Sequence, residues 1–189
     1  MALHGTCPET QSVFRTLVDA MSRPGRTGEL FVSEETGDPA LGLYEVARTL
    51  MDHEVSYHVL SPRREELDAR LFAITKARRA GLSEADYVVV EPCRSGGKVL
   101  QAQRGTARFP DTGATVIYLL DGSTGSPRIT LRGPGIRDEI KPEMGGLDPE
   151  ELGHIRRCNA DYPLGVDCMF LNDRHQVMCI PRTTEIEVD

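Results

Sequence analysis

The chain has 189 residues, a formal net charge of −7 at pH 7 and a hydrophobic fraction of 39%. This length fits one domain and leaves little room for two, while the acidic balance argues against general binding of nucleic acid or anionic membranes, which needs clustered positive charge. Because no apolar run approaches the roughly 20 residues of a membrane span and the start shows no signal-peptide pattern, we expect one cytoplasmic domain over residues 1–189.

Apolar residues at helical spacing predict three helices in the first half of the chain. The first ends at Ser22-Arg23-Pro24-Gly25, because proline disfavours helical geometry in the residue before it. The second opens at Asp38-Pro39 and reaches about residue 51, and the third follows Ser61-Pro62 and ends at Gly81. The apolar stripe of the first helix consists of Val13, Phe14, Leu17, Val18 and Met21.

Strands are predicted between and after these helices. The first half contributes runs at 29–33, 55–60 and 86–90, and residues 98–104 suggest a short helix. The apolar run 113–120 is the best candidate for a central strand, and a Gly/Ser-rich turn would join it in a hairpin to a strand at 128–131. A capped helix over 148–159 and strands at 165–171, 176–180 and 183–188 complete the chain. This order predicts a single α/β domain with a mixed sheet between helix layers.

Several known catalytic motifs do not fit. Gly96-Gly97-Lys98 resembles part of a phosphate-binding loop, but Pro92 and Val99 stand where that motif requires a glycine and a Ser or Thr. Neither a GxSxG elbow nor an HExxH motif occurs, and the histidines show no distinctive spacing to any cysteine. The cysteines are scattered without CxxC spacing, which favours buried or inert thiols over disulfides or a metal site: they are Cys7, Cys93, Cys158, Cys168 and Cys179.

Pyridoxal phosphate would need a lysine for its internal aldimine. Lysine occurs only at 76, 98 and 141. Lys76 belongs to a basic helix face with Arg78 and Arg79, and the other two are expected in loops. We therefore expect no such cofactor, and no metal.

Arginines beside glycine, proline or threonine are the remaining candidates. Arg132 precedes a Gly-Pro-Gly corner directly after a predicted strand, Arg23 precedes Pro24-Gly25, and Arg182 precedes Thr183. Asp167 lies on an apolar strand and needs a partner if it is buried. One reading is a structural Arg–Asp pair and a solvated turn. The other is an anion-binding pocket built from Arg23, Arg132, Gly133, Gly135, Asp167, Arg182 and Thr183.

Five sequence blocks, in order, resemble one family. They are Phe14-Arg15-x-Leu17-x-x-Ala20-Met21-Ser22-x-Pro24-Gly25, Gly113-Ala114-Thr115, Leu131-Arg132-Gly133-Pro134-Gly135-Ile136, Pro163-Leu164-Gly165-Val166-Asp167 and Ile180-Pro181-Arg182-Thr183-Thr184. Each block is short, but together they closely resemble the PhnH family, the H subunit of the bacterial carbon–phosphorus lyase core complex. The resemblance runs from about residue 11 to the C-terminus.

The resemblance implies a three-layer α/β/α sandwich similar to pyridoxal-phosphate-dependent transferases but without the cofactor. It also implies a homodimer that joins the G, I and J subunits. With the G and I subunits and the L protein, family members take part in forming ribose 1-phosphonate 5-triphosphate from MgATP and a phosphonate. No catalytic residue carries over.

Three hypotheses follow for phosphonate catabolism. The chain is a non-autonomous subunit of this transferase and lyase system that supplies structure or binds an anion. Alternatively, Arg132 and Arg182 hold triphosphate or phosphonate during catalysis. A third hypothesis is a stand-alone enzyme that binds a small phosphate or phosphonate.

Overall fold

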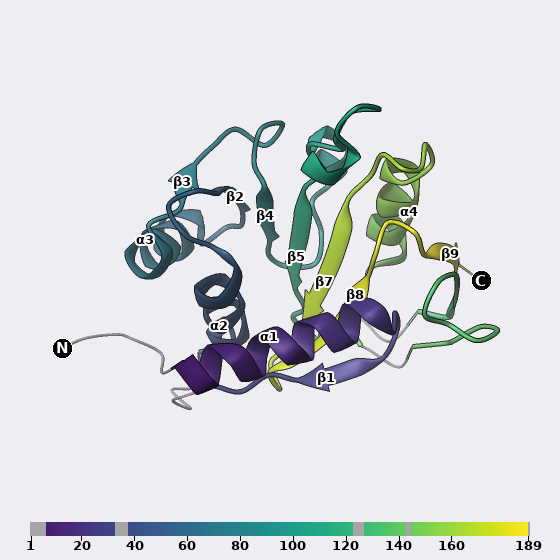
Figure 1. Ribbon diagram of the computed structural model, residues 1–189, viewed down its shortest axis with the longest axis horizontal. Helices are drawn as coiled ribbons and strands as arrows, with labels where there is room; N and C mark the ends of the chain where they lie inside the picture. Colours follow the sequence, from purple (N-terminus) through teal and green to yellow (C-terminus); the bar gives the residue numbers. More distant parts are fainter. Residues whose placement is uncertain (1–6, 33–37, 123–126, 143–144, 189) are drawn as a thin grey trace.

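The computed structural model describes residues 7–32, 38–122, 127–142 and 145–188. Its elements are drawn in Figure 1. In chain order they are α1 (Cys7–Ser22), β1 (Thr27–Glu29), α2 (Leu41–Leu50), β2 (Ser56–Leu60), α3 (Arg64–Thr75), β3 (Arg78–Arg79), β4 (Tyr87–Val90), the 3-10 helices η1 (Lys98–Gln101) and η2 (Pro110–Thr112), β5 (Thr115–Leu119), β6 (Ile129–Arg132), α4 (Pro149–Cys158), β7 (Asp167–Leu171), β8 (Gln176–Ile180) and β9 (Glu185–Val188).

A mixed, mostly parallel sheet forms the centre of the fold, in the order β1-β8-β7-β5-β4-β2-β3. Strands β3, β2, β4, β5 and β7 are parallel, whereas β8 runs antiparallel to both of its neighbours. Outside this sheet, β6 and β9 form an antiparallel pair close to α4 (Figure 1). The α/β prediction with a mixed sheet is therefore confirmed.

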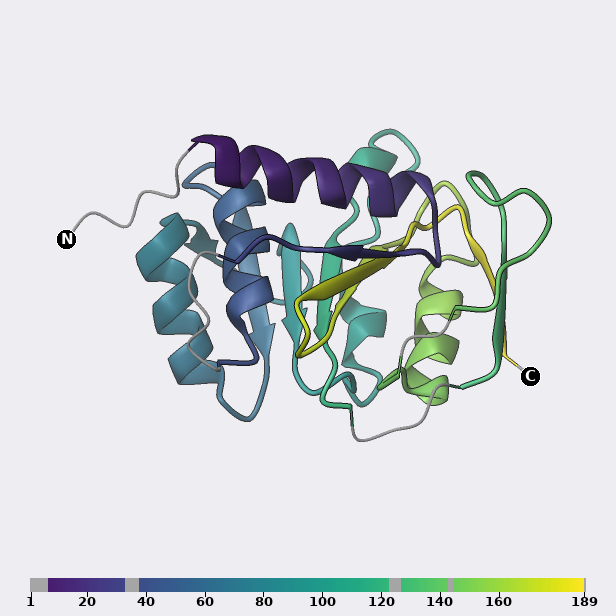
Figure 2. The same ribbon diagram turned by 90° about the horizontal axis from the view of Figure 1, so that it is seen from below.

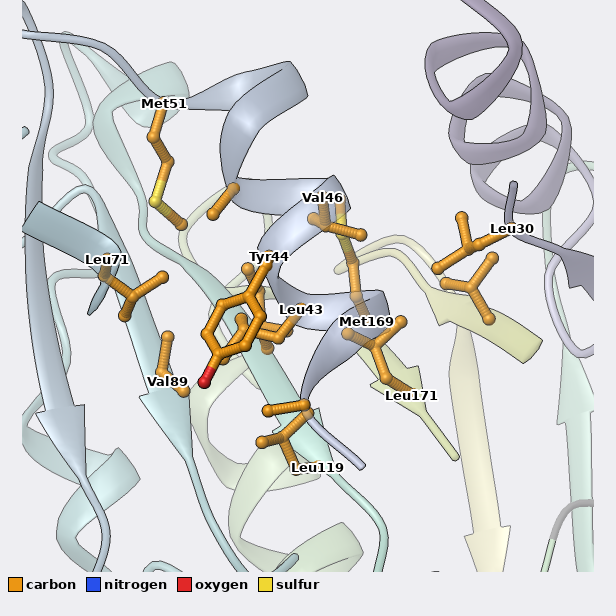
Figure 3. Close-up of a cluster of buried hydrophobic side chains, with 14 of the residues drawn as sticks. Leu30, Leu43, Tyr44, Val46, Met51, Leu71, Val89, Leu119, Met169 and Leu171 are labelled. Atoms are coloured by element: carbon orange, nitrogen blue, oxygen red, sulfur yellow. The ribbon is translucent and has the colours of Figure 1, made fainter. Parts of the chain in front are cut away.

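Each face of the sheet has its own apolar cluster, because side chains of a strand alternate between the two faces. Val89 and Ile117 pack with α1, α2 and α3 on one face, and Figure 3 shows part of that cluster around Tyr44. Val88 and Val116 pack on the other face with residues of η1, α4, β6 and β9. Figure 2 shows α1 and α4 on opposite sides of the sheet. The central strands are continuous apolar runs because both of their faces are covered.

Local signals place most helix ends correctly. The Asp148 carboxylate accepts a hydrogen bond from the backbone N–H of Glu150 at 3.0 Å, and Pro149 opens α4 where no N–H donor is needed. The Asp38 carboxylate likewise accepts from the N–H of Ala40 at 2.9 Å just before α2. The helices predicted after these residues are confirmed.

The predicted hairpin between the strands at 113–120 and 128–131 is wrong. β5 lies between β4 and β7, so both of its edges are already paired within the sheet. β6 instead pairs with β9, Leu131 lying opposite Ile186. The three closing strands exist, but only β7 and β8 belong to the main sheet.

The third helix and the first apolar stripe also differ from expectation. α3 ends at Thr75, because Lys76 adopts a left-handed conformation (φ 61°) that stops the helix before Gly81. The chain then forms β3, a strand that the sequence did not predict. On α1, Phe14 and Val18 are each 51% exposed, so they lie outside the buried stripe. The short helix expected at 98–104 is the 3-10 turn η1. The strand expected at 29–33 is wrong except at Glu29, because β1 spans Thr27–Glu29, residues 30–32 are not strand and Ser33 lies outside the described residues.

Candidate functional site

Arg182 and Asp167 form the structural pair that was one of the two readings of these residues. The Asp167 carboxylate accepts from Arg182 Nη2 at 2.6 Å, from Nε at 3.1 Å and from the backbone N–H at 2.8 Å. Arg182 also donates to the carbonyls of Pro110 at 2.6 Å and Gly113 at 3.3 Å. Its guanidinium thus links β7, η2 and the start of β5 while only 12% of the side chain is exposed. Little of its hydrogen-bonding capacity remains for a ligand.

The Gly-Pro-Gly corner packs against the end of α1 and against the segment before β9. Gly135 has a φ of +83°, and a Cβ there would collide with the carbonyl of Ser22. A Cβ on Gly133 would lie 2.9 Å from the carbonyl oxygen of Thr183. Only glycine accommodates both the backbone conformation and the close approach. The corner is therefore an internal joint between segments far apart in the sequence.

Other glycines of the sequence blocks make similar joints. Gly25 faces Leu131 and Ile140, where a Cβ would lie 2.8 Å from Ile140 Cγ2. Gly113 faces Arg182, whose Nη1 would lie 2.6 Å from a Cβ at that position. The five blocks that carry the family resemblance therefore meet in one connected region, which we call the motif junction (residues 22–25, 113–115, 131–136, 163–167 and 180–184).

Arg132 and Arg23 lie at the surface rather than in a pocket built for them. Arg132 Nη1 donates to the Glu187 carboxylate at 2.6 Å and Nη2 donates to Glu139 at 2.6 Å, and 45% of the side chain is exposed. These hydrogen bonds raise the pKa of Arg132 and lower the pKa of Glu187. Arg23 pairs with Asp19 one helical turn earlier. Both arginines already have carboxylate partners.

A groove of about 1180 Å³ nevertheless opens beside the motif junction, between the end of α4 and β9. Of the seven residues proposed from the sequence, Arg132, Arg182 and Thr183 line it. Asp167 lines a neighbouring hollow of about 420 Å³, which shares Tyr162, Arg182 and Thr183 with the groove. Gly133 and Gly135 shape the corner behind the groove, and Arg23 is not part of its described lining. The structure thus brings some of the candidate residues together, but not as one seven-residue pocket.

Sequence reasoning missed two arginines of this groove. Arg156 and Arg157 close the last turn of α4 and line the groove, and both are exposed. Within the described ranges, neither forms an ion pair. The adjacent Arg-Arg pair at the end of a capped helix was visible in the sequence. However, the helix dipole alone already explains cations at the end of a helix, so the sequence did not indicate that these two arginines lie beside β9.

A buried carboxylate on the same helix has a structural role. Glu151 is 2% exposed and accepts hydrogen bonds from the Tyr118 hydroxyl and the Ser95 backbone N–H, both at 2.9 Å. It holds the loop after β4 against α4. His154 Nδ1 lies 3.6 Å from the same carboxylate. The two hydrogen bonds give the buried Glu151 side chain the polar partners that burial requires.

The described thiols are poor nucleophiles. Cys93, Cys158, Cys168 and Cys179 are free and buried. Burial raises the pKa of Cys93 and of Cys179 to about 12 and that of Cys158 to about 11, and it raises the pKa of Cys168 as well. Because thiolates are the reactive species, these residues do not suit nucleophilic catalysis. The expectation of buried thiols is confirmed for these four; the side chain of Cys7 lies outside the described residues.

Raised thiol pKa values predict a loss of stability in alkali. In the unfolded chain a thiol ionises at about pH 8.5, whereas the folded chain keeps the buried thiols protonated to much higher pH. The buried thiols therefore contribute fully to the free energy of unfolding below about pH 8.5, and this contribution is lost as the pH rises toward 11–12. We expect the urea midpoint to fall between pH 8 and pH 10. Thiol labelling should be slow in the native protein and reach all five cysteines only after unfolding; rapid native labelling of the four buried thiols would contradict this.

Residues 7–32, 38–122, 127–142 and 145–188 contain no group of three or more His, Cys, Asp or Glu side chains arranged to hold a metal ion. Nor do they include a helix that is both long and apolar enough to cross a membrane.

Comparison with known proteins decides the family. Residues 2–187 match the family described as bacterial phosphonate metabolism protein (PhnH). The chain belongs to the PhnH family. It is 32% identical over 187 residues to a protein of Stutzerimonas stutzeri provisionally named C-P lyase subunit protein HtxG, covering 96% of this chain and 87% of that protein. It is also 32% identical over 186 residues to alpha-D-ribose 1-methylphosphonate 5-triphosphate synthase subunit PhnH of Rhizobium meliloti (strain 1021), covering 95% and 90%.

Membership of the PhnH family confirms the resemblance that the five sequence blocks indicated. The structure adds that these blocks are neighbours in space. Their glycines make close backbone contacts, and Arg182, which is largely enclosed, ties separate segments together. The shared blocks therefore indicate, first, how a PhnH chain is folded.

Proposed function

We propose that this chain is a subunit of a carbon–phosphorus lyase system for phosphonate catabolism. It would act with the G and I subunits and the L protein in forming ribose 1-phosphonate 5-triphosphate from MgATP and a phosphonate. The proposal is supported by membership of the PhnH family and by the name of the Rhizobium meliloti relative, a subunit of a ribose 1-methylphosphonate 5-triphosphate synthase.

One observation favours a structural contribution within such a complex. The motif junction uses its most specific residues internally: Arg182 on Asp167 and two carbonyls, and Gly133 and Gly135 in close backbone contacts. Residues committed to these contacts hold a surface in shape, as a docking subunit requires. We therefore propose a non-autonomous subunit that the other chains need in order to act.

The catalytic hypothesis requires Arg132 to bind triphosphate or phosphonate as an essential group. We expect Arg132→Ala to lower the turnover of the reconstituted ribosyl-transfer reaction only a few-fold, because Glu139 and Glu187 compete with any ligand for this exposed guanidinium. The measurement is release of adenine from ATP in the presence of a phosphonate, with subunit assembly checked by gel filtration. A large fall in turnover with assembly intact would favour the catalytic hypothesis instead.

Partner contacts are part of the same proposal. We propose a homodimer that associates with the G, I and J subunits, as the family resemblance implies. Light scattering of the isolated chain at micromolar concentration should give the mass of two copies, and co-expression should recover it together with the other subunits. A monomer that copurifies with none of them would contradict the subunit proposal, and turnover by the isolated chain would favour the stand-alone enzyme.

We also expect the central sheet to resemble that of pyridoxal-phosphate-dependent transferases, which superposition on a member of that fold would test. We expect the protein in the cytoplasm, which cell fractionation would test.

A further inference from the structure

The groove between α4 and β9 brings Arg132 of the third sequence block together with two arginines from outside the blocks. Arg156 and Arg157 reach it from α4, and Arg132 reaches it from the end of β6. The dipole of α4 accounts for positive charge at a helix end. It does not account for a third arginine, from another element, lining the same concave surface. This is a local basic surface on a chain whose net charge is −7.

A carboxylate of the protein itself already lies among these cations. Glu187 accepts from Arg132 at 2.6 Å. The positive charges of Arg156 and Lys141 add to that of Arg132 in lowering its pKa. Glu139 binds the other end of the same guanidinium at 2.6 Å. The arginines therefore stabilise a carboxylate oxyanion beside Arg132, and in this structure Glu187 and Glu139 supply it.

The wall of the groove also contains polar atoms that lack partners. Asn159 Oδ1 accepts a hydrogen bond from the N–H of Val166 at 2.8 Å, whereas its Nδ2 is buried and has no acceptor among the described residues. Thr184 is 5% exposed, and its Oγ1 has no partner either. Unpaired buried polar atoms are rare, because each one costs stability. Because both atoms are buried, only a water enclosed in the wall or a small shift of the wall would give them partners.

We propose that this groove binds a multiply charged phosphate or phosphonate oxyanion through Arg132, Arg156 and Arg157, and that Glu139 and Glu187 mask Arg132 until the ligand displaces them. Such an anion can accept bidentate, charge-assisted hydrogen bonds from the planar guanidinium groups. Tyr162, 64% exposed and on the same lining, offers an aromatic face to a base attached to the phosphates. The inference deepens the proposed function and rests on it for the identity of the anion.

The first test uses tripolyphosphate as the probe, titrated into the isolated full chain by calorimetry at low salt. We expect the double variant Arg156→Gln/Arg157→Gln to bind about tenfold more weakly or worse, since charge-assisted hydrogen bonds are lost. The matched control is Arg15→Gln/Arg64→Gln, which removes the same charge from exposed positions on α1 and α3. It should bind like wild type. If both double variants weakened binding equally, the probe would be held only by the overall charge of the chain, and the proposal would be overturned. Absence of binding to the wild type at millimolar tripolyphosphate would overturn it as well.

The second test addresses the masking carboxylates. Glu187→Gln should bind tripolyphosphate several-fold more tightly, because the competing internal anion is removed while the size of the side chain is kept. Unchanged or weaker binding by Glu187→Gln would show that Glu187 does not compete with the ligand for Arg132. If Arg156→Gln/Arg157→Gln instead abolished copurification with the other subunits and left probe binding intact, the groove would be a protein interface. The reaction assay and the copurification test the proposed function separately, so either proposal can fail without the other.

Discussion

Replacing Arg182 with methionine is expected to lower the free energy of unfolding by about 3 kcal/mol, measured by urea denaturation at pH 7. The substitution keeps the length and apolar stem of the side chain but removes its charge. Asp167 would then lose its charged partner in a largely enclosed site, and the carbonyls of Pro110 and Gly113 would lose their donor. Removing one member of a pair that is largely shielded from solvent is costly, because the other charge stays behind without compensation.

Arg104→Met is the matched control for this prediction. Arg104 lies 3.7 Å from Asp161, and both side chains are exposed, at 40% and 72%. Pairs of this kind contribute about 0–1 kcal/mol. If Arg182→Met cost no more than Arg104→Met, the linking role of Arg182 would be wrong. Arg182 would then be free to act as the ligand-binding residue that the sequence suggested.

Replacing Gly135 with alanine is expected to cost about 2–4 kcal/mol, since strained backbone and a steric clash combine. Its φ of +83° disfavours any side chain, and the new Cβ would collide with the Ser22 carbonyl and lie 3.0 Å from Pro24 Cδ. The corner between β6 and the end of α1 would have to move. Thermal or urea unfolding measures the loss, and copurification with the other subunits should fall with it.

Gly96→Ala separates the two contributions. Gly96 also has a positive φ, +61°, but nothing lies within 4 Å of a Cβ there. Its replacement should cost about 1–2 kcal/mol, from the backbone conformation alone. If Gly135→Ala lowered the free energy of unfolding by no more than Gly96→Ala, the corner would adjust to the new Cβ at no cost. Its close packing on α1 would then be unimportant for stability.

Most of the central fold could be predicted because its signals are local. The apolar runs of β4 and β5 identify strands covered on both faces, and the Asp148-Pro149 signal places the start of α4 to the residue. Which strands pair with each other is not determined by local sequence. The turn between β5 and β6 looked like a hairpin, yet β5 was already paired on both edges. Which strands meet depends on contacts across the whole chain.

The candidate site divides in the same way. The residue types around Gly133 and Gly135 correctly indicated a tight corner, and Asp167 correctly indicated the need for a cationic partner. The position of the cavity could not be read from the sequence, because it lies between α4 and β9. Arg156 and Arg157 became candidates only when the fold put β9 beside the end of α4.

The sequence by itself determined the family, the α/β class and the tight glycine-rich corner after β6, because these follow from residue types at short spacing and from five blocks in order. The tertiary structure alone decided what each arginine does. Arg182 is enclosed and bound by Asp167, while Arg132 is exposed between Glu139 and Glu187. The physical reason is that an arginine's charge is constant, but its partners come from segments up to 72 residues away in the sequence, which only the folded chain brings together.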